Sequence, residues 1–330
     1  MKKAFGLLSV LIVFSMVLAA CGGGNNSSNN KTGGSAATNA PATEAPATEA
    51  PPAEITVKHQ LGETVVKVNP EKVVVFDFGM LDSLDKLGVE VAGVPQANIP
   101  PYLSKYEDSK YANVGSLKEP DFEALSELSP DLIIISGRQQ TAYEELTKLA
   151  PTIFLGVDTS KYLESFEENN KILGQIFNKE AEVAAEIEAV EATIAAVKER
   201  ATASGKNGLI ILANEGNISA YGAGSRFGII HDVLGIAPVD PEIKVETHGN
   251  SVTFEYILEK NPDYLFVVDR DAVVAGEPAA KATVENDLVK NTNAFKNGNI
   301  VYLDPNYWYL SGGGLVSVSE MVKSIDAAIK

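Results

Sequence analysis

The sequence predicts an α/β protein of two lobes, each built on a mostly parallel central sheet, with one long α-helix joining them. Three observations support this prediction: repeated apolar runs, an internal repeat, and a long helical pattern between the repeats. The apolar runs KVVVFDF, DLIIIS, PTIFLGV, GLIILA, DYLFVVD and GNIVYLD are rich in β-branched residues and lack polar alternation. Such runs are typical of strands buried on both faces, as in parallel sheets covered by helices.

The internal repeat pairs FEALSELSPDLIIISGR at residues 122–138 with FEYILEKNPDYLFVVDR at residues 254–270. Both copies begin with Phe-Glu, continue with a short helical pattern, Pro-Asp and an apolar run, and end on arginine. A second pair lies upstream, LDSLDKLGV at 81–89 and FGIIHDVLGI at 227–236, each typical of a helix that ends at a glycine. Strand and helix patterns recur in any α/β protein, but the conserved spacing within the long repeat favours a duplicated unit.

The helical pattern between the repeats runs over residues 179–200, which contain no Gly or Pro and many good helix formers. Its apolar positions recur at spacings of three and four, which predicts one amphipathic helix. These positions are Val183, Ile187, Val190, Ile194 and Val197. A stiff helix of this length would restrict how far two lobes can swing.

The first 54 residues are typical of a signal peptide and a tether. Residues 1–20 combine two lysines, a short apolar run and small residues before Cys21, and the ending resembles a bacterial lipobox. That resemblance implies that Cys21 becomes a lipidated first residue. Residues 21–54 lack the large apolar side chains that would offset ordering entropy, so we expect a flexible low-complexity tether.

The remaining chain is expected to divide into three parts: an N-terminal lobe, a linker helix region and a C-terminal lobe, at residues 55–163, 164–203 and 204–330. Cys21 is the only cysteine, which excludes a disulfide and a catalytic thiol. The net charge of −17 disfavours nucleic-acid binding through a basic surface. Neither a nucleophile elbow, a P-loop nor a zinc-protease motif is present, and the three histidines lack metal-ligand spacing.

Arginine is scarce in this chain, and its positions are informative. Of 27 basic residues only four are arginine, and Arg200 falls on the predicted linker helix as a surface charge. Arg138 and Arg270 each follow an apolar run, at the carboxyl end of a strand, where open parallel sheets bind ligands. Arg226 follows a Gly-rich segment in which Ser225 or Gly224 is a candidate helix start, and a helix N-terminus favours anions.

Arginine at three such positions predicts an oxyanionic ligand. A guanidinium stays charged, is weakly hydrated and donates to oxygen anions in a fixed fork. Each charge-assisted hydrogen bond contributes roughly 1.5–3 kcal/mol. Internal salt bridges to Asp or Glu are the alternative for any one of these arginines. A dinucleotide fingerprint is disfavoured, because the glycine spacing departs from G-x-G-x-x-G.

Other candidate ligand contacts lie in NYWYLSGGGL, residues 306–315, which follows the last apolar run. Tyr307, Trp308 and Tyr309 are candidates for stacking on an aromatic ligand, with core packing as the favoured alternative for one of Tyr307 and Trp308. Ser311 and the glycines at 312–314 are candidates to present backbone amides at a helix start. His248 lies in a polar loop, where a pocket role and simple exposure are both open.

The combination of signal, lipobox, tether, duplicated lobes and linking helix resembles the class III substrate-binding lipoproteins of ABC importers. The segments SRFGIIHDVLG, THGNSV, NPDYLFVVDR and WYLSGGG are similar to those of petrobactin and catecholate siderophore receptors of Gram-positive bacteria. The resemblance covers the chain beyond Ile55. It implies the class III periplasmic-binding-protein fold, with two Rossmann-like lobes, and a receptor without enzymatic activity.

The resemblance also implies roles for individual residues. Arg138, Arg226 and Arg270 match the arginine triad that surrounds the anionic ferric complex in catecholate-type members. Tyr309 and His248 match residues that complete iron coordination in some relatives when the siderophore supplies fewer than six donors. No intrinsic cofactor is implied, because the Fe(III) arrives as a siderophore complex. Ferric citrate, a hydroxamate siderophore and haem remain alternative ligands.

The partners follow from the same resemblance. Glu123 and Glu255, at equivalent positions near two predicted helix starts, match lobe-surface glutamates that engage permease arginines. Stabilising the helix dipole is the simpler role for both residues. The implied partners are an importer permease and its ATPase, with no nucleic acid. The protein would be a monomer on the outer face of the cell membrane, held there through its lipid anchor.

Overall fold

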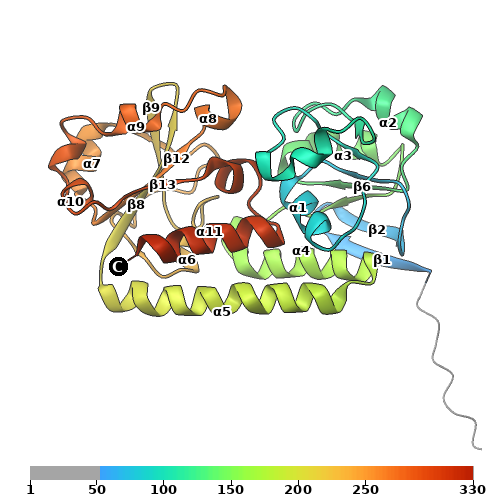
Figure 1. The fold of residues 1–330 in the computed structure, drawn as a ribbon, viewed down its shortest axis with the longest axis horizontal. Helices are drawn as coiled ribbons and strands as arrows, with labels where there is room; N and C mark the ends of the chain where they lie inside the picture. The colour runs from blue at the N-terminus through green and yellow to red at the C-terminus, as the bar shows by residue number, and fades with distance from the viewer. Residues whose placement is uncertain (1–52, 330) are drawn as a thin grey trace, which may run out of the picture. The chain divides into compact units, whose positions relative to one another are not determined.

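The computed structural model describes residues 53–329, so the predicted signal peptide, Cys21 and nearly all of the tether lie outside the described residues. An antiparallel hairpin of β1 (Glu54–His59) and β2 (Gly62–Lys67) begins the described chain. A five-stranded sheet of order β5-β4-β3-β6-β7 follows, and every pairing in it is parallel (Figure 1). Its strands are β3 (Val73–Val75), β4 (Gly93–Val94), β5 (Ala112–Asn113), β6 (Leu132–Ile135) and β7 (Thr152–Phe154).

A second sheet forms from the C-terminal half of the chain, in the order β11-β9-β8-β12-β13, with β10 also paired to β8. β8, β10, β12 and β13 run parallel, whereas β9 and β11 are antiparallel additions. The strands are β8 (Asn207–Asn214), β9 (Asn217–Tyr221), β10 (Ala237–Pro238), β11 (Asn250–Val252), β12 (Tyr264–Asp269) and β13 (Ile300–Leu303). The prediction of mostly parallel sheets in an α/β fold is therefore confirmed.

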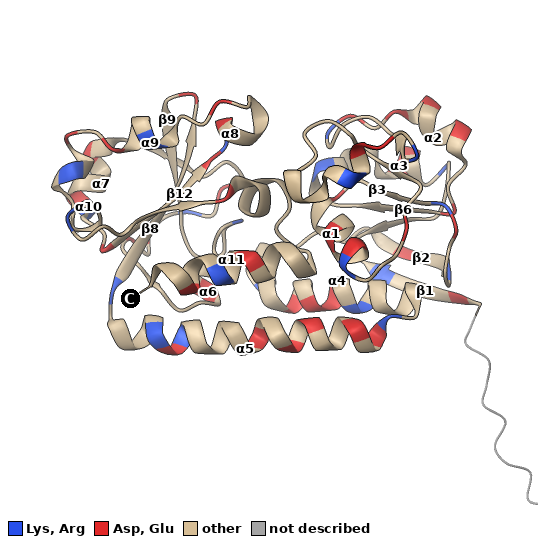
Figure 2. Ribbon diagram, viewed as in Figure 1, with Lys and Arg blue, Asp and Glu red and all other residues tan. Residues whose placement is uncertain are grey.

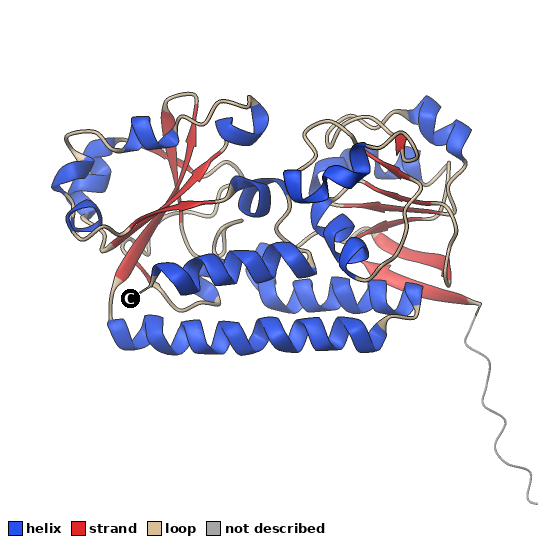
Figure 3. Cartoon of the chain, viewed as in Figure 1, coloured by secondary structure: helices blue, strands red, loops and turns tan. Residues whose placement is uncertain are grey.

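The apolar runs of the central strands β6, β8 and β12 lack polar alternation because both faces of these strands are buried, and Figure 3 shows helices packed around the sheets. Ile133 and Ile134 are adjacent on β6 but pack into different hydrophobic clusters. Leu265 and Phe266 on β12 divide in the same way. Successive side chains on a strand point to opposite faces, so each face needs its own apolar residues.

The helices include the long one that the sequence predicts. α5 (Glu180–Ser204) follows α4 (Tyr162–Phe177), and Asn178 between them has a φ of 52° that ends α4. The predicted stripe from Val183 to Val197 is buried and packs with residues of α11 (Leu315–Ala328). Figure 1 shows α4, α5 and α11 side by side, and the contacts agree. Within residues 53–329 no helix is long and apolar enough to cross a membrane.

Shorter helices complete the two halves. The α-helices are α1 (Phe78–Lys86), α2 (Phe122–Leu128), α3 (Tyr143–Leu146), α6 (Ile229–Asp232), α7 (Phe254–Lys260), α8 (Asp271–Val274), α9 (Ala280–Val284) and α10 (Asn293–Lys296). The 3₁₀ segments are η1 (Pro101–Glu107), η2 (Gly137–Ala142), η3 (Thr159–Lys161) and η4 (Val289–Asn291), while η5 (Asn306–Leu310) is a π-helical turn.

The two copies of the sequence repeat adopt the same local structure. Each forms a seven-residue helix, α2 or α7, followed by a residue in the left-handed conformation and then a buried strand. The left-handed residues are Ser129, with φ 50°, and Asn261, with φ 46°. Asp121 caps α2 by accepting from two backbone amides, and Thr253 caps α7. The repeated spacing therefore encodes one helix–turn–strand unit used twice.

A buried polar junction ties α1 to the start of α11. The Asp82 carboxylate accepts from the backbone amides of Val316 at 3.1 Å and Ser317 at 3.0 Å. Ser83 Oγ accepts from the amide of Leu315 at 2.9 Å. A Cβ at Gly314 would lie 1.9 Å from an Asp82 carboxylate oxygen, so only glycine permits this approach. The free amides at the helix start are thus satisfied by the first lobe.

We expect this junction to make stability depend on pH. Burial raises the pKa of Asp82 to about 7, although hydrogen bonds from Ser317, Val316 and Tyr102 oppose the shift. The folded-state pKa exceeds the unfolded value of 3.8. The contribution of Asp82 to stability is therefore fully present below about pH 4 and lost as the pH rises through about 7. Denaturant titrations between pH 4 and 8 measure the free energy of unfolding. In Asp82→Asn its decrease over this range should be smaller than in the wild type by on the order of 2–4 kcal/mol.

The matched control for this measurement is Asp85→Asn, on the same helix. Asp85 is partly exposed and paired with Lys105, so its replacement should leave the pH dependence in place. If the same pH dependence persisted in Asp82→Asn, Asp82 would not be its source.

Candidate anion-binding site

Three arginines converge on one residue. Arg138 follows β6 and lies in η2, Arg270 follows β12, and Arg226 lies in the turn between β9 and α6. Tyr309 lies in the π-helical turn η5 after β13, and such turns often occur at functional sites. All four side chains are partly buried. We call Arg138, Arg226 and Arg270 the arginine cluster.

Backbone carbonyls accept from two members of the cluster. Arg138 donates from Nη2 to the carbonyl of Tyr309 at 2.7 Å and from Nη1 to that of Leu310 at 3.2 Å. Arg226 donates from Nη2 to the same Tyr309 carbonyl at 3.0 Å. Because Arg138 comes from the first sheet and Arg226 from beside the second, one carbonyl joins guanidinium groups from both halves of the chain.

The side chain of Tyr309 contacts Arg270 and Arg226. Arg270 donates from Nε to the Tyr309 hydroxyl at 3.0 Å, and the Arg226 guanidinium lies 4.6 Å from the centre of the Tyr309 ring. Asn214, at the end of β8, accepts from Arg270 Nη1 through its side-chain oxygen. Neutral oxygens therefore satisfy much of this cluster.

The cluster keeps an excess of positive charge. Among the described residues, Arg270 is the only one of the three with a carboxylate within 4.0 Å, and that contact, with Asp271, is at the limit. Burial, and then repulsion from Arg138, lowers the pKa of Arg226, but a guanidinium remains charged at neutral pH. Unmatched positive charge in a protein of net charge −17 is suited to an anionic ligand.

The same charges act on Tyr309. Burial alone would raise the pKa of its phenol, but the hydrogen bond from Arg270 and the charges of Arg226, Arg270 and Arg138 together lower it. Ionisation of Tyr309 is therefore easier here than in an ordinary tyrosine. A phenolate oxygen is a hard anionic donor.

The other predicted ligand contacts, Trp308, His248 and Tyr307, differ in their burial and neighbours. Trp308 is 3% exposed and packs in the core with α5 and α11, so its indole offers no surface for stacking and that part of the prediction is corrected. His248 is exposed in its loop. Tyr307 packs its ring against that of Tyr102 at 4.7 Å, and the Tyr102 hydroxyl lies 2.6 Å from Ser311 Oγ.

Two further expectations, which concern backbone amides at helix starts, are wrong. In one the helix begins at another residue, and in the other the amides already donate to acceptors within the protein. No helix starts at Ser225, since α6 begins at Ile229 and spans only four residues. The backbone amides near the start of α11 already have acceptors in the protein: those of Gly313 and Gly314 donate to Ser317 Oγ, and those of residues 315–317 donate to Ser83 and Asp82. The arginine side chains, rather than helix dipoles, therefore supply the positive charge.

Glu123 and Glu255 occupy equivalent places, each in the first turn of its helix, α2 or α7. Both are exposed, and Figure 2 shows acidic positions on α2 and along α4 and α5. Hydrogen bonds to its own backbone amide and to Thr253 lower the pKa of Glu255. Both carboxylates are thus available to a partner.

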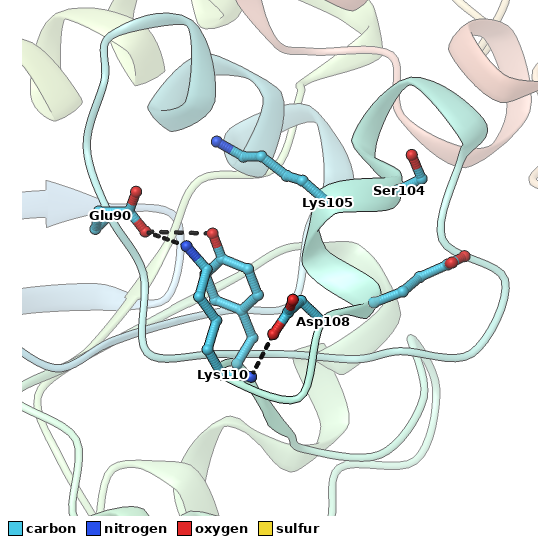
Figure 4. Close-up of a pocket in the computed structure, with 7 residues that line it drawn as sticks. Glu90, Ser104, Lys105, Asp108 and Lys110 are labelled. Atoms are coloured by element: carbon cyan, nitrogen blue, oxygen red, sulfur yellow. Dashed lines mark hydrogen bonds and ion pairs between the residues drawn. The ribbon is translucent and has the colours of Figure 1, made fainter.

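Two surface pockets are less suited than the arginine cluster to binding an anion. One, of about 580 Å³, is lined by residues that include Glu90, Lys105, Asp108 and Lys110 (Figure 4). Both of its lysines are already paired, Lys110 with Glu90 at 3.7 Å and Lys105 with Asp85. The other lies between β2 and α3. Among residues 53–329, no three or more His, Cys, Asp or Glu side chains are placed to hold a metal ion.

Sequence reasoning missed Asn214 and Tyr102. Asn214 directly follows the apolar run GLIILA, so the rule that predicted Arg138 and Arg270 applies to it as well. Tyr102 reaches Ser311 across a long separation in sequence, and no local pattern marks such a contact.

Two α/β lobes joined by a long helix, with a charged cluster drawn from both, define a solute-binding protein. Residues 73–307 match the Periplasmic binding protein family, and the chain belongs to that family. Its fold is the class III form, an α/β architecture shared with the solved relatives.

One relative is named for petrobactin, and a solved relative is named for catecholate siderophores. The chain is 51% identical to the petrobactin-binding protein YclQ of Bacillus subtilis over 98% of each chain. The crystal structure of that protein matches with a TM-score of 0.82 and 56% identity, over 84% of this chain and 99% of the other. The periplasmic catecholate-siderophore binding protein VctP of Vibrio cholerae matches with a TM-score of 0.81 and 39% identity, over 83% and 99%.

The electrostatic coupling in the cluster is testable without a ligand. Arg270→Gln removes the donor to the Tyr309 hydroxyl and one positive charge, so the pKa of Tyr309 should rise. ¹³C-tyrosine NMR titration measures it, with Tyr309→Phe to assign the resonance. Arg200→Gln, on the distant surface of α5, is the control and should leave the pKa of Tyr309 unaltered. An unchanged value in Arg270→Gln would contradict the coupling.

Proposed function

We propose that this protein is a non-enzymatic, lipid-anchored receptor that captures a ferric catecholate siderophore, petrobactin or a close analogue, and delivers it to an ABC importer. The observation that carries the proposal is the convergence of three arginines, of which only Arg270 has a carboxylate within 4.0 Å among the described residues. The relatives named for petrobactin and catecholate siderophores support the choice of ligand.

The charge of the ligand decides between the candidates. A ferric catecholate complex carries several negative charges on aromatic oxygens, which suits fork-shaped donors that are weakly hydrated. A neutral hydroxamate complex would leave the buried guanidinium groups without compensation, and this is costly. Ferric citrate and haem are the remaining alternatives. The Fe(III) is cargo within the siderophore, and the protein needs no cofactor of its own.

Tyr309 is also proposed as a supplementary iron donor, with His248, for siderophores that supply fewer than six donor atoms. The lowered pKa of Tyr309 favours its phenolate form. The position of Tyr309 at the centre of the cluster brings this oxygen to the expected site of the anionic complex.

Delivery is the second half of the proposal. Lipidation at Cys21 would hold a monomer on the outer face of the membrane, next to the permease and its ATPase. Glu123 and Glu255 lie on equivalent helices, one in each half of the chain. Because they are exposed and acidic, they are suited to arginines on the permease.

Ligand binding is tested through Trp308, the only tryptophan of the chain, whose neighbour Tyr309 lies in the cluster. A ferric catecholate should quench its emission saturably, and ferric citrate, ferric hydroxamate and haem should do so more weakly. Replacing Arg138, Arg226 or Arg270 singly by Gln should weaken binding at least about tenfold, or about 1.4 kcal/mol. Arg200→Gln serves as the control. Wild-type affinity in the triple variant would rule out the charge argument.

Delivery is tested by the double variant Glu123→Ala with Glu255→Ala. It should keep wild-type affinity for the siderophore and lose most iron-dependent uptake in cells, because contact with the permease loses its charge. Glu127 and Glu259 provide the control, since they are exposed, lie one turn further along the same helices and are also related by the repeat. Equal loss of uptake in both double variants would point to a general effect of surface charge.

A further inference from the structure

Asn214 and Arg270 leave the second sheet next to each other. β8 and β12 are parallel neighbours in which Ala213 pairs with Asp269, and the amide of Arg270 donates to the carbonyl of Ala213 at 3.1 Å. The next residues after Ala213 and Asp269 are Asn214 and Arg270, which therefore lie side by side at the carboxyl end of the sheet. The sheet register itself sets this juxtaposition.

Arg270 is held by two neutral acceptors on different atoms. Its Nη1 donates to the side-chain oxygen of Asn214, and its Nε donates to the Tyr309 hydroxyl at 3.0 Å. A guanidinium has five N–H donors, so these contacts orient the group and leave donors for a ligand. The amide oxygen of Asn214 orients the Arg270 guanidinium and leaves its positive charge in place. A carboxylate at the same position would neutralise that charge.

The nearby carboxylate is committed elsewhere. Asp271 is 8% exposed, and its Oδ2 accepts from the backbone amide of Glu215 at 2.7 Å. Its other oxygen lies 4.0 Å from Arg270 Nη1. Asp271 therefore mainly secures the turn after β8 and leaves Asn214 as the nearer partner of Arg270.

Asn214 stands on a rigid backbone. It pairs with Asn217 across the turn from β8 to β9, where Glu215 has φ 51° and Gly216 has φ 77°. A two-residue turn with positive φ at both positions is a tight hairpin that matches strand twist. The Asp271 contact with Glu215 fixes the same turn from the side of β12.

We propose that Asn214 is a positioning residue of the anion-binding site, which aims the Arg270 guanidinium at the ligand and, being neutral, preserves its full charge. This inference rests on the proposed function for its consequence in binding. The contacts that carry it are all between residues of this chain.

The decisive variants are Asn214→Asp and Asn214→Ala. Asp keeps the shape and adds a charge that neutralises Arg270, so affinity for a ferric catecholate should fall about tenfold or more. Ala removes the acceptor and leaves the charge, so affinity should fall only a few-fold. The affinity of Asn214→Asp should also depend less on ionic strength than that of the wild type.

A matched control lies at the other end of the same strand. Asn207 on β8 accepts from the backbone amide of Asp263, beside β12, at 3.0 Å. Asn207→Asp and Asn207→Ala therefore perturb the same strand pair far from the cluster, and they should leave affinity unchanged. Thermal unfolding of all four variants identifies any that fail to fold.

A ligand-free measurement separates this inference from the proposed function. In Asn214→Asp the added carboxylate offsets the charge of Arg270, so the pKa of Tyr309 should rise in ¹³C-tyrosine NMR titration. In Asn214→Ala it should change much less. If wild-type protein bound no ferric catecholate, the proposed function would fail, and this titration would still decide the role of Asn214. An unchanged Tyr309 pKa in folded Asn214→Asp, or equal losses of affinity in the Asn207 variants, would overturn the proposal.

Discussion

The hydrogen bonds from the first turn of α11 to Asp82 and Ser83 are the contact on which the rest of the site depends. They attach the last helix of the chain to α1, which precedes the linker helix by almost a hundred residues. Gly314 permits the approach because it lacks a Cβ. The segment just before α11 is thereby held, and with it the carbonyl and phenol of Tyr309. Through Tyr309 this segment meets all three arginines, since its carbonyl accepts from Arg138 and Arg226 and its hydroxyl accepts from Arg270.

The electrostatics of the cluster explain why its acceptors are neutral. Carboxylates are abundant in this acidic chain, yet the contacts to the arginines come mainly from carbonyls, an amide and a phenol. Burying cations without counter-ions is unfavourable, and an incoming anion relieves that penalty. A binding site differs in this respect from a structural salt bridge, in which the charge is already satisfied.

Much of the fold could be predicted because its signals are local. The β-branched runs become β6, β8 and β12, and the spacing of three and four becomes the buried stripe of α5. The errors arose where long-range contacts decide the outcome. Trp308 and Tyr309 are adjacent in sequence, but the π-helical turn directs one into the core and the other toward the arginines. The amides that follow Gly314 donate to Asp82 and Ser83 on α1, and these acceptors lie too far away in the sequence for a local pattern to predict.

The sequence by itself determined the α/β class, the repeat, and the three arginines whose rarity indicates an anion. Each of these follows from residue type and spacing within one short segment. The tertiary structure alone decided that the arginines meet at Tyr309, that Asn214 supports Arg270, and that helix amides take no part. Such facts depend on which strands are neighbours and which helix ends are covered, and these are settled by packing between segments far apart in the chain.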